Sequence, residues 1–271
     1  MKAIITDLDR TLLRTDKSVS EYTCEVLKRC RERGIFLMAA TARPERAVTE
    51  YQRQIGFDAV TTLNGARILL PGGAEENGIS PRSAEAILRE VTAMPRVTLS
   101  LETGEGIFSN VPIPEWDAVV FEGFPALPTQ SVIYKILLSR EGGTACAIQP
   151  EVERALRPDT YMTVADGKLI QIMSTAATKW NGIRTMLRWA GVDPGETVYF
   201  GDDNDDIEPI KNCGLGVAVS NAIGEVLDAA DIVADSNDQD GVARYIERNL
   251  LFTGEALSQA LQRVLHPAGN R

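Results

Sequence analysis

Residues 2–13 read KAIITDLDRTLL, a short hydrophobic run followed by two carboxylates two positions apart, Asp7 and Asp9. The run is brief and partly β-branched, which predicts a buried strand over residues 2–6. Side chains two positions apart in an extended chain point to the same side, so the two carboxylates can converge. Carboxylates held that close repel each other unless a cation lies between them. The stretch predicts either a site for a nucleophile, an acid and Mg²⁺, or an acidic turn that satisfies local backbone donors.

Hydrophobic strands and amphipathic helices alternate on both sides of a long middle segment. A helix is expected at residues 20–33, closed by Gly34, and another is expected to open at Pro44. The pattern resumes with a helix that begins at Lys179. Strands are expected at residues 35–40, 59–63, 197–200, 215–219 and 232–234. This alternation predicts an α/β fold with a Rossmann-like parallel-sheet core.

The middle segment has a different pattern, with one helix expected at residues 83–91 and several short strands. A hairpin is expected at residues 161–173, turned by Asp166-Gly167, and residues 67–70 are expected to pair with the segment before them. The sequence predicts a catalytic core made of residues 1–77 and 175–271. An α+β cap domain, residues 78–174, is inserted into it. A last helix is expected at residues 255–265.

Composition excludes several classes of function. The chain has 271 residues with 28 basic and 38 acidic side chains, so its net charge of −10 argues against nucleic acid or an anionic membrane as partner. No hydrophobic run approaches the ~20 residues of a membrane span. The four cysteines form no CxxC pair, and we expect a cytoplasmic protein. The only histidine, His266, lies near the end of the chain, which makes a histidine-based triad improbable.

A second acidic cluster follows the strand expected at residues 197–200, where residues 201–206 read GDDNDD. A calcium-binding EF-hand loop is excluded, because Ile207 and Cys213 stand where glycine and glutamate are needed. No Walker loop is present. If their strands are neighbours in the sheet, Asp7 and Asp202 could share a magnesium ion. The alternative is a solvated helix start, where aspartate is common.

These motifs, in this order, resemble the haloacid dehalogenase superfamily. They are Asp7-Leu8-Asp9-Arg10-Thr11-Leu12, Thr41, Lys179 and the acidic run that starts at Asp202. More closely the chain resembles the Cof-type phosphatases, which carry a large α+β (type IIB-like) cap between their second and third motifs. Asn64-Gly65-Ala66 and residues 216–222 are similar to that family as well. Three positions depart from its pattern: Arg10 and Ala42 replace glycine, and Asp205 replaces asparagine.

The resemblance implies a Mg²⁺-dependent phosphatase that hydrolyses a small-molecule phosphate monoester through an aspartyl-phosphate. Asp7 would be the nucleophile and Asp9 the general acid and base. Mg²⁺ would bind Asp7, Asp202 and the carbonyl oxygen of Asp9. Phosphate or substrate would contact the segment Thr41-Ala42, Asn64 and Lys179, with supporting roles for Thr11, Asp205 and Asp206.

Two other functions stay open on the sequence alone. A sugar phosphomutase would use the same aspartates and return the phosphoryl group to a sugar. A non-catalytic protein that binds phosphate esters would keep the residues without turnover. Sugar phosphates and phosphorylated cofactors or metabolites are candidate substrates, and the oligomeric state is open.

Overall fold

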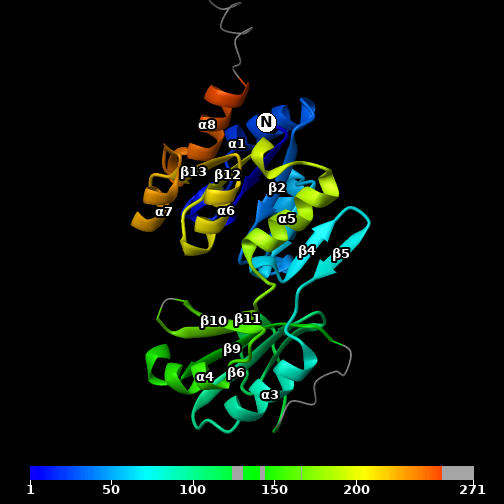
Figure 1. The fold of residues 1–271 in the computed structure, drawn as a ribbon, viewed down its shortest axis with the longest axis vertical. Helices are drawn as coiled ribbons and strands as arrows, with labels where there is room; N and C mark the ends of the chain where they lie inside the picture. The colour runs from blue at the N-terminus through cyan, green and yellow to red at the C-terminus, as the bar shows by residue number, and fades with distance from the viewer. Residues whose placement is uncertain (124–130, 141–143, 166, 252–271) are drawn as a thin grey trace, which may run out of the picture. The chain divides into compact units, whose positions relative to one another are not determined.

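The computed structural model describes residues 1–123, 131–140, 144–165 and 167–251. Contacts divide the chain into two compact units, one formed by residues 1–60 with those from 183 onward, the other by residues 61–182 (Figure 1). The predicted cap boundaries at residues 78 and 174 stay a prediction. Asp166, the helix expected at residues 255–265 and His266 lie outside the described residues.

The first unit is built on a parallel sheet. Its strands follow the order β14-β13-β12-β1-β2-β3, and the pairs formed by β1, β2, β12, β13 and β14 are parallel. The bounds are β1 Ala3–Thr6, β2 Phe36–Ala40, β3 Ala59–Thr62, β12 Thr197–Gly201, β13 Leu215–Val219 and β14 Ile232–Ala234. The predicted α/β fold is therefore confirmed.

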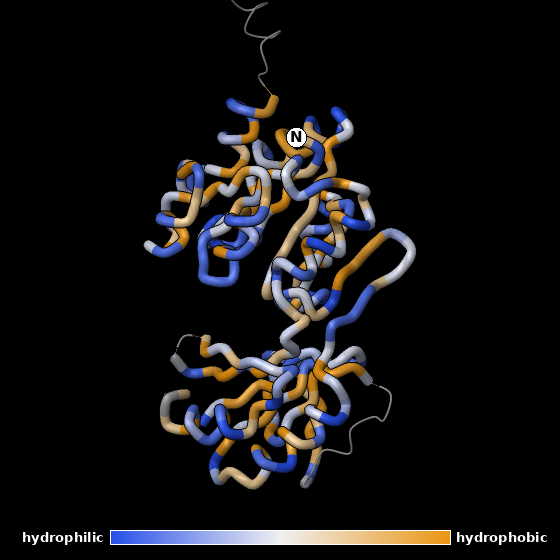
Figure 2. The backbone as a smooth tube through the Cα atoms, in the orientation of Figure 1, coloured by the Kyte–Doolittle hydropathy of each residue, from blue (hydrophilic) through white to orange (hydrophobic). Residues whose placement is uncertain are grey.

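The central strands are buried on both faces. All residues of β1 and β12 are buried, and Ile4, Ile5, Tyr199 and Phe200 are among the largest fully buried side chains. Continuous hydrophobic runs are typical of strands that have helices on both sides of a parallel sheet. Figure 2 shows hydrophobic stretches alternating with hydrophilic ones along the chain.

The first helix of this unit, α1, ends beside the Gly34 that the sequence predicts as its stop. Ser20 accepts a hydrogen bond from the backbone N–H of Thr23 and so caps α1, and Gly34, with φ +75°, follows that helix. α1 packs on α8, and α6 packs beside β12 and β13. The bounds are α1 Glu21–Glu32, α2 Glu45–Ile55, α5 Lys179–Ala190 (in this unit from residue 183 onward), α6 Ile207–Asn212, α7 Gly224–Ala229 and α8 Gly241–Ile246.

The second unit contains a mainly antiparallel sheet in the order β10-β11-β9-β6-β7-β8. Helices α3 Pro81–Val91 and α4 Gln149–Ala155 share one hydrophobic core with the strands. The strand bounds are β6 Val97–Thr103, β7 Gly106–Ser109, β8 Val119–Val120, β9 Ile133–Arg140, β10 Thr160–Ala165 and β11 Leu169–Ser174. No helix in the described part of the chain is long and apolar enough to cross a membrane.

The pairing predicted for residues 67–70 is confirmed, because strand β4, Arg67–Leu70, lies next to β3, the strand that precedes it, in the sheet order β3-β4-β5. It also pairs antiparallel with β5, Gly73–Glu76, which follows it. The turn between them contains Pro71 and Gly72, and Gly72 has a φ of +96° that favours glycine. The break at Pro71-Gly72 is thus a hairpin turn within this unit.

Candidate active site

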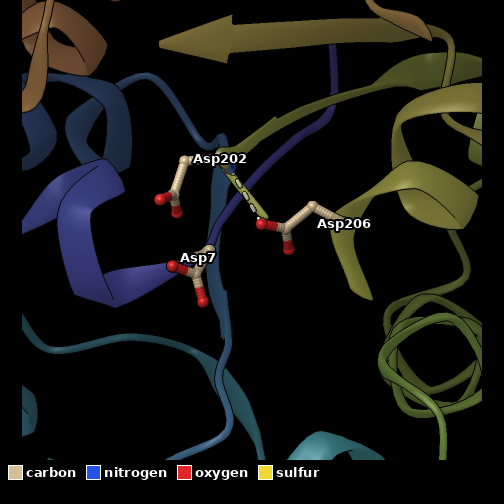
Figure 3. Close-up of side chains that lie close together, drawn as sticks. All are labelled: Asp7, Asp202 and Asp206. Atoms are coloured by element: carbon tan, nitrogen blue, oxygen red, sulfur yellow. Dashed lines mark hydrogen bonds between the residues drawn. The ribbon is translucent and has the colours of Figure 1, made fainter. Parts of the chain in front are cut away.

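Three buried carboxylates meet at one edge of the parallel sheet (Figure 3). Strands β1 and β12 are parallel neighbours, with Thr6 opposite Phe200, so the residues that follow them leave the sheet at the same edge. Asp7, Asp202 and Asp206 each place one carboxylate oxygen within 4.8 Å of the others. Parallel sheets place their ligands at this carboxyl edge.

Asp206 is held by the protein itself. One of its oxygens accepts hydrogen bonds from the backbone N–H groups of Asp202 (2.9 Å) and Asp203 (3.0 Å), and the other accepts from the Tyr199 hydroxyl. A Cβ at Gly201 would lie 2.5 Å from the Asp206 Cβ, so only glycine fits there. Asp206 therefore fixes the backbone of the loop that carries Asp202. Asp205 lies beside it in the short helical turn of residues 204–206.

Asp202 faces the segment that carries Asp9. The Thr11 hydroxyl donates to Asp202 Oδ1 at 2.8 Å, and Arg10 Nε lies 3.9 Å from Asp202 Oδ2. Arg10 has a φ of +59°, a conformation that glycine adopts more easily, which explains the glycine of the Cof-type pattern at this position. Its side chain is largely exposed, so Arg10 brings a cation to the edge of the acidic cluster.

Asp9 is paired with two cations. Arg43 donates to both of its carboxylate oxygens, from Nε at 2.6 Å and Nη2 at 2.8 Å, and Lys17 Nζ donates at 2.7 Å. Burial would raise the pKa of Asp9, but the hydrogen bonds and charges of Arg43 and Lys17 outweigh it and lower the pKa from 3.8 to about 2. Asp9 is consequently ionised at neutral pH in this structure.

Substitution of Arg43 by glutamine is expected to move the Asp9 pKa upward from about 2 toward 3.8. A carboxyl with a lowered folded pKa stabilises the fold above pH 3.8 and loses that contribution as the pH falls through about 2. Because Asp9 is partly exposed, we expect R43Q to lose less than about 1 kcal/mol at pH 7. Carboxyl carbon NMR titration and urea unfolding measure both effects.

The matched control is Arg53→Gln, because Arg53 is exposed on α2, the helix that follows Arg43. It should leave the Asp9 titration unchanged. An unchanged midpoint in R43Q would contradict the assigned ion pair.

Thr41 and Ala42 follow β2 at the same edge of the sheet. Thr41 is buried, and its hydroxyl accepts a hydrogen bond from the backbone N–H of Arg43 at 3.2 Å. Ala42 is exposed. The hydroxyl therefore helps to shape the turn that delivers Arg43 to Asp9.

Asn64 and Lys179 belong to the second unit. Asn64 lies in the short helical turn Leu63–Gly65 that follows β3, with a φ of +57°, and its Oδ1 accepts a hydrogen bond from Lys135 Nζ at 3.0 Å. Lys179 is the first residue of α5 and is only 4% exposed. An ammonium buried at that depth needs compensating partners.

Two asparagines brace the Asp9 loop: Asn221, which lies in the family-like run 216–222, and Asn237, which the sequence did not single out. Asn221 Nδ2 donates to the Arg10 carbonyl at 2.8 Å, and Asn221 Oδ1 accepts from the backbone N–H of Asn237 at 2.9 Å. Asn237 Nδ2 donates to the Leu13 carbonyl at 3.0 Å. The only sequence feature that pointed to these contacts was Asn221 itself, which follows the strand at residues 215–219.

Substitution of Asn221 by alanine removes the partner of the Arg10 carbonyl and of the Asn237 backbone N–H. We expect the free energy of unfolding to fall by about 1 kcal/mol. We also expect kcat for hydrolysis of a phosphate ester to fall about tenfold, because the Asp9 loop loses its support. Asn221→Asp keeps the acceptor and loses the donor, so it should fall between wild type and N221A. Steady-state kinetics and urea unfolding measure these effects. Wild-type kcat in N221A would remove the proposed role of the brace.

Comparison with known proteins agrees with this architecture. The sequence profile of the haloacid dehalogenase-like hydrolase family matches residues 4–246. The 5-amino-6-(5-phospho-D-ribitylamino)uracil phosphatase YitU of Bacillus subtilis (strain 168) is 24% identical over 258 residues, which cover 90% of this chain and 96% of that protein. The HMP-PP phosphatase of Cronobacter sakazakii is 25% identical over 234 residues, covering 82% of this chain and 85% of that one.

A solved structure of a sugar phosphatase of subclass IIB shares the fold. It superposes with a TM-score of 0.75 at 20% sequence identity, covering 92% of this chain and 98% of the other. The resemblance first drawn from the order of the motifs is thus confirmed. The chain belongs to the haloacid dehalogenase-like hydrolase family.

Proposed function

We propose that the chain is a Mg²⁺-dependent phosphatase that hydrolyses a small-molecule phosphate monoester at Asp7. The observation that carries the proposal is the gathering of Asp7 and Asp202 at the ends of adjacent parallel strands, with their carboxylates buried. Named relatives act on small phosphorylated compounds, namely the ribitylaminouracil phosphate of YitU and the HMP-PP of the Cronobacter enzyme.

The donor set fits a hard divalent cation. Asp7 and Asp202 are 4% and 5% exposed, and close buried carboxylates favour a cation between them. Asp206 already accepts hydrogen bonds at both oxygens, which leaves Asp7 and Asp202 as the proposed carboxylate ligands. The family resemblance adds the carbonyl oxygen of Asp9 as the third proposed ligand. When bound, Mg²⁺ supplies charge that offsets the repulsion between carboxylate and phosphate.

The proposed reaction has two steps. In the first, an Asp7 oxygen bonds to phosphorus, the bond from phosphorus to the leaving oxygen breaks, and the proton of Asp9 passes to that oxygen. In the second, water attacks phosphorus, Asp9 takes its proton, and the bond between Asp7 and phosphorus breaks. One carboxylate serves both steps because the acid and base roles reverse.

The acid role requires Asp9 to hold a proton. In the present arrangement Arg43 and Lys17 keep its pKa at about 2. Loosening of these ion pairs when an anionic substrate arrives would raise that pKa and allow protonation. Arg43 and Lys17 thereby couple the protonation state of Asp9 to the presence of phosphate.

The remaining site residues are assigned to phosphate binding. Thr41 and Lys179 would hold the phosphoryl oxygens, and Asn64 would contact phosphate or substrate. Residues 78–174 would act as the cap that excludes bulk water and selects the leaving group. Thr11, whose hydroxyl donates to Asp202, would support the metal site. Asp205 and Asp206 would support it as well.

Purified protein with Mg²⁺ should hydrolyse p-nitrophenyl phosphate and a set of metabolite phosphate esters. Release of inorganic phosphate measures the activity. A requirement for a sugar bisphosphate would favour the mutase alternative. Tight ester binding without turnover across the set would favour the non-catalytic one.

A further inference from the structure

Tyr199 lies in the middle of β12 and is fully buried. Alternate residues of a strand point to the same face, so Tyr199 shares a face with Gly201. Asp206 packs directly on that face, because a Cβ at Gly201 would lie 2.5 Å from the Asp206 Cβ. The Tyr199 side chain leaves the same face, and its hydroxyl donates to Asp206 Oδ1. The missing side chain at Gly201 thus gives the space in which the phenol meets the carboxylate.

The two oxygens of Asp206 have different tasks. Oδ2 accepts the backbone N–H groups of Asp202 and Asp203 and so fixes the loop, whereas Oδ1 accepts the Tyr199 hydroxyl. A phenylalanine would fill nearly the same volume in this buried strand, and burial of a hydroxyl costs free energy unless the hydroxyl is hydrogen-bonded. Packing therefore explains the ring of Tyr199, and the hydroxyl is explained by its effect on Asp206.

Asp206 lies within reach of an ion shared by the other two carboxylates (Figure 3). It offers an oxygen that lies within 4.8 Å of an oxygen of Asp7 and of Asp202. Two oxygens on opposite sides of one ion are about 4.2 Å apart for Mg²⁺ and up to about 5.2 Å apart for Ca²⁺. A hydrogen-bond donor on Asp206 therefore competes with an ion for this carboxylate.

A third carboxylate would change the ion that the site prefers. Mg²⁺ binds one or two carboxylates together with waters and phosphate oxygens, whereas Ca²⁺ takes more oxygen ligands at longer distances. A third carboxylate would also reduce the positive charge that attracts a phosphate ester. We propose that Tyr199 is a positioning residue that withholds Asp206 from the ion and makes the site selective for Mg²⁺ over Ca²⁺. The inference rests on the proposed function, in which Asp7 and Asp202 bind Mg²⁺.

Tyr199→Phe tests this role by metal binding alone. Isothermal titration calorimetry without substrate gives the dissociation constants of Mg²⁺ and Ca²⁺ for the wild type and the variant. We expect the ratio of the Ca²⁺ constant to the Mg²⁺ constant to fall at least about fivefold in Y199F, because Asp206 Oδ1 loses the hydroxyl donor and can turn to the larger ion. An unchanged ratio would overturn the proposal.

Asp206→Asn separates charge from coordination. Its amide oxygen can accept the two backbone N–H groups while its NH₂ group donates to the Tyr199 oxygen. Loss of the charge should weaken the binding of both ions by a similar factor, since they carry the same charge, and should leave the ratio unchanged. The double variant Y199F/D206N should also keep the wild-type ratio. A rise of the ratio in D206N would show that Asp206 already binds the ion in the wild type, which contradicts the proposal.

Tyr245→Phe is the matched control, because it removes the hydroxyl of another tyrosine beside β12. Tyr245 is half-buried on α8, and its ring meets that of Phe200 edge-on at a centroid distance of 5.7 Å. Y245F should keep the wild-type ratio. If Y199F does not fold, as judged by circular dichroism, D206N decides the question.

The wild type separates this inference from the proposed function. Wild-type protein that binds Mg²⁺ and hydrolyses p-nitrophenyl phosphate, with a ratio that does not respond to Y199F, would refute the role of Tyr199 and leave the proposed function standing. Absence of Mg²⁺ binding in the wild type would refute both.

Discussion

Asp7→Asn is expected to lower kcat for phosphate monoester hydrolysis by at least about 10⁴-fold, because the amide cannot attack phosphorus and no other group replaces it. The same change should raise the thermal stability of the metal-free protein. It removes one of three buried carboxylates whose oxygens lie within 4.8 Å of each other, and with it their mutual repulsion. Phosphate release and thermal unfolding in EDTA measure the two effects.

Loss of activity together with a gain of stability distinguishes removal of a nucleophile from damage to the fold. Asp117→Asn is the control, since Asp117 is exposed and has a φ of +52° that asparagine also tolerates. It should change neither property. A loss of only a few-fold in D7N would refute Asp7 as the nucleophile.

Asp202→Asn should abolish the stabilisation of the folded protein by Mg²⁺. For the wild type, saturation at 100 times the dissociation constant should stabilise the fold by about 2.7 kcal/mol, because the ion binds the folded state alone. The variant keeps an oxygen for the Thr11 hydroxyl, so its metal-free fold should be maintained. Its carboxylate charge is lost, and kcat at 1 mM Mg²⁺ should fall by roughly 10²- to 10³-fold.

Thermal unfolding with and without Mg²⁺ provides a readout that is independent of turnover. EDTA should reduce the wild type to the same low activity, and added Mg²⁺ should restore it. Equal stabilisation of D202N and the wild type by Mg²⁺ would exclude Asp202 as a ligand. Full activity in EDTA would exclude the metal itself.

The sequence by itself determined the layered fold and the place of the acidic cluster. The short hydrophobic runs before Asp7 and Asp202 predicted buried strands, and their alternation with helices predicted a parallel sheet. Parallel strands end at one edge, so two acidic motifs far apart in the chain had to meet if their strands were neighbours. The register of β1 and β12 confirms that condition.

Only the tertiary structure decided which partners these residues have. Arg43 pairs with Asp9 across 34 positions of sequence, and Asn237 reaches Leu13 across 224. Asp206 is fixed by backbone donors of its own loop, and Lys135 by Asn64 and Gln171. The local pattern of hydrophobic and polar residues indicates whether a segment forms a strand or a helix and where that segment ends. It does not report which side chains from distant segments come within hydrogen-bonding distance, because that depends on how the elements pack.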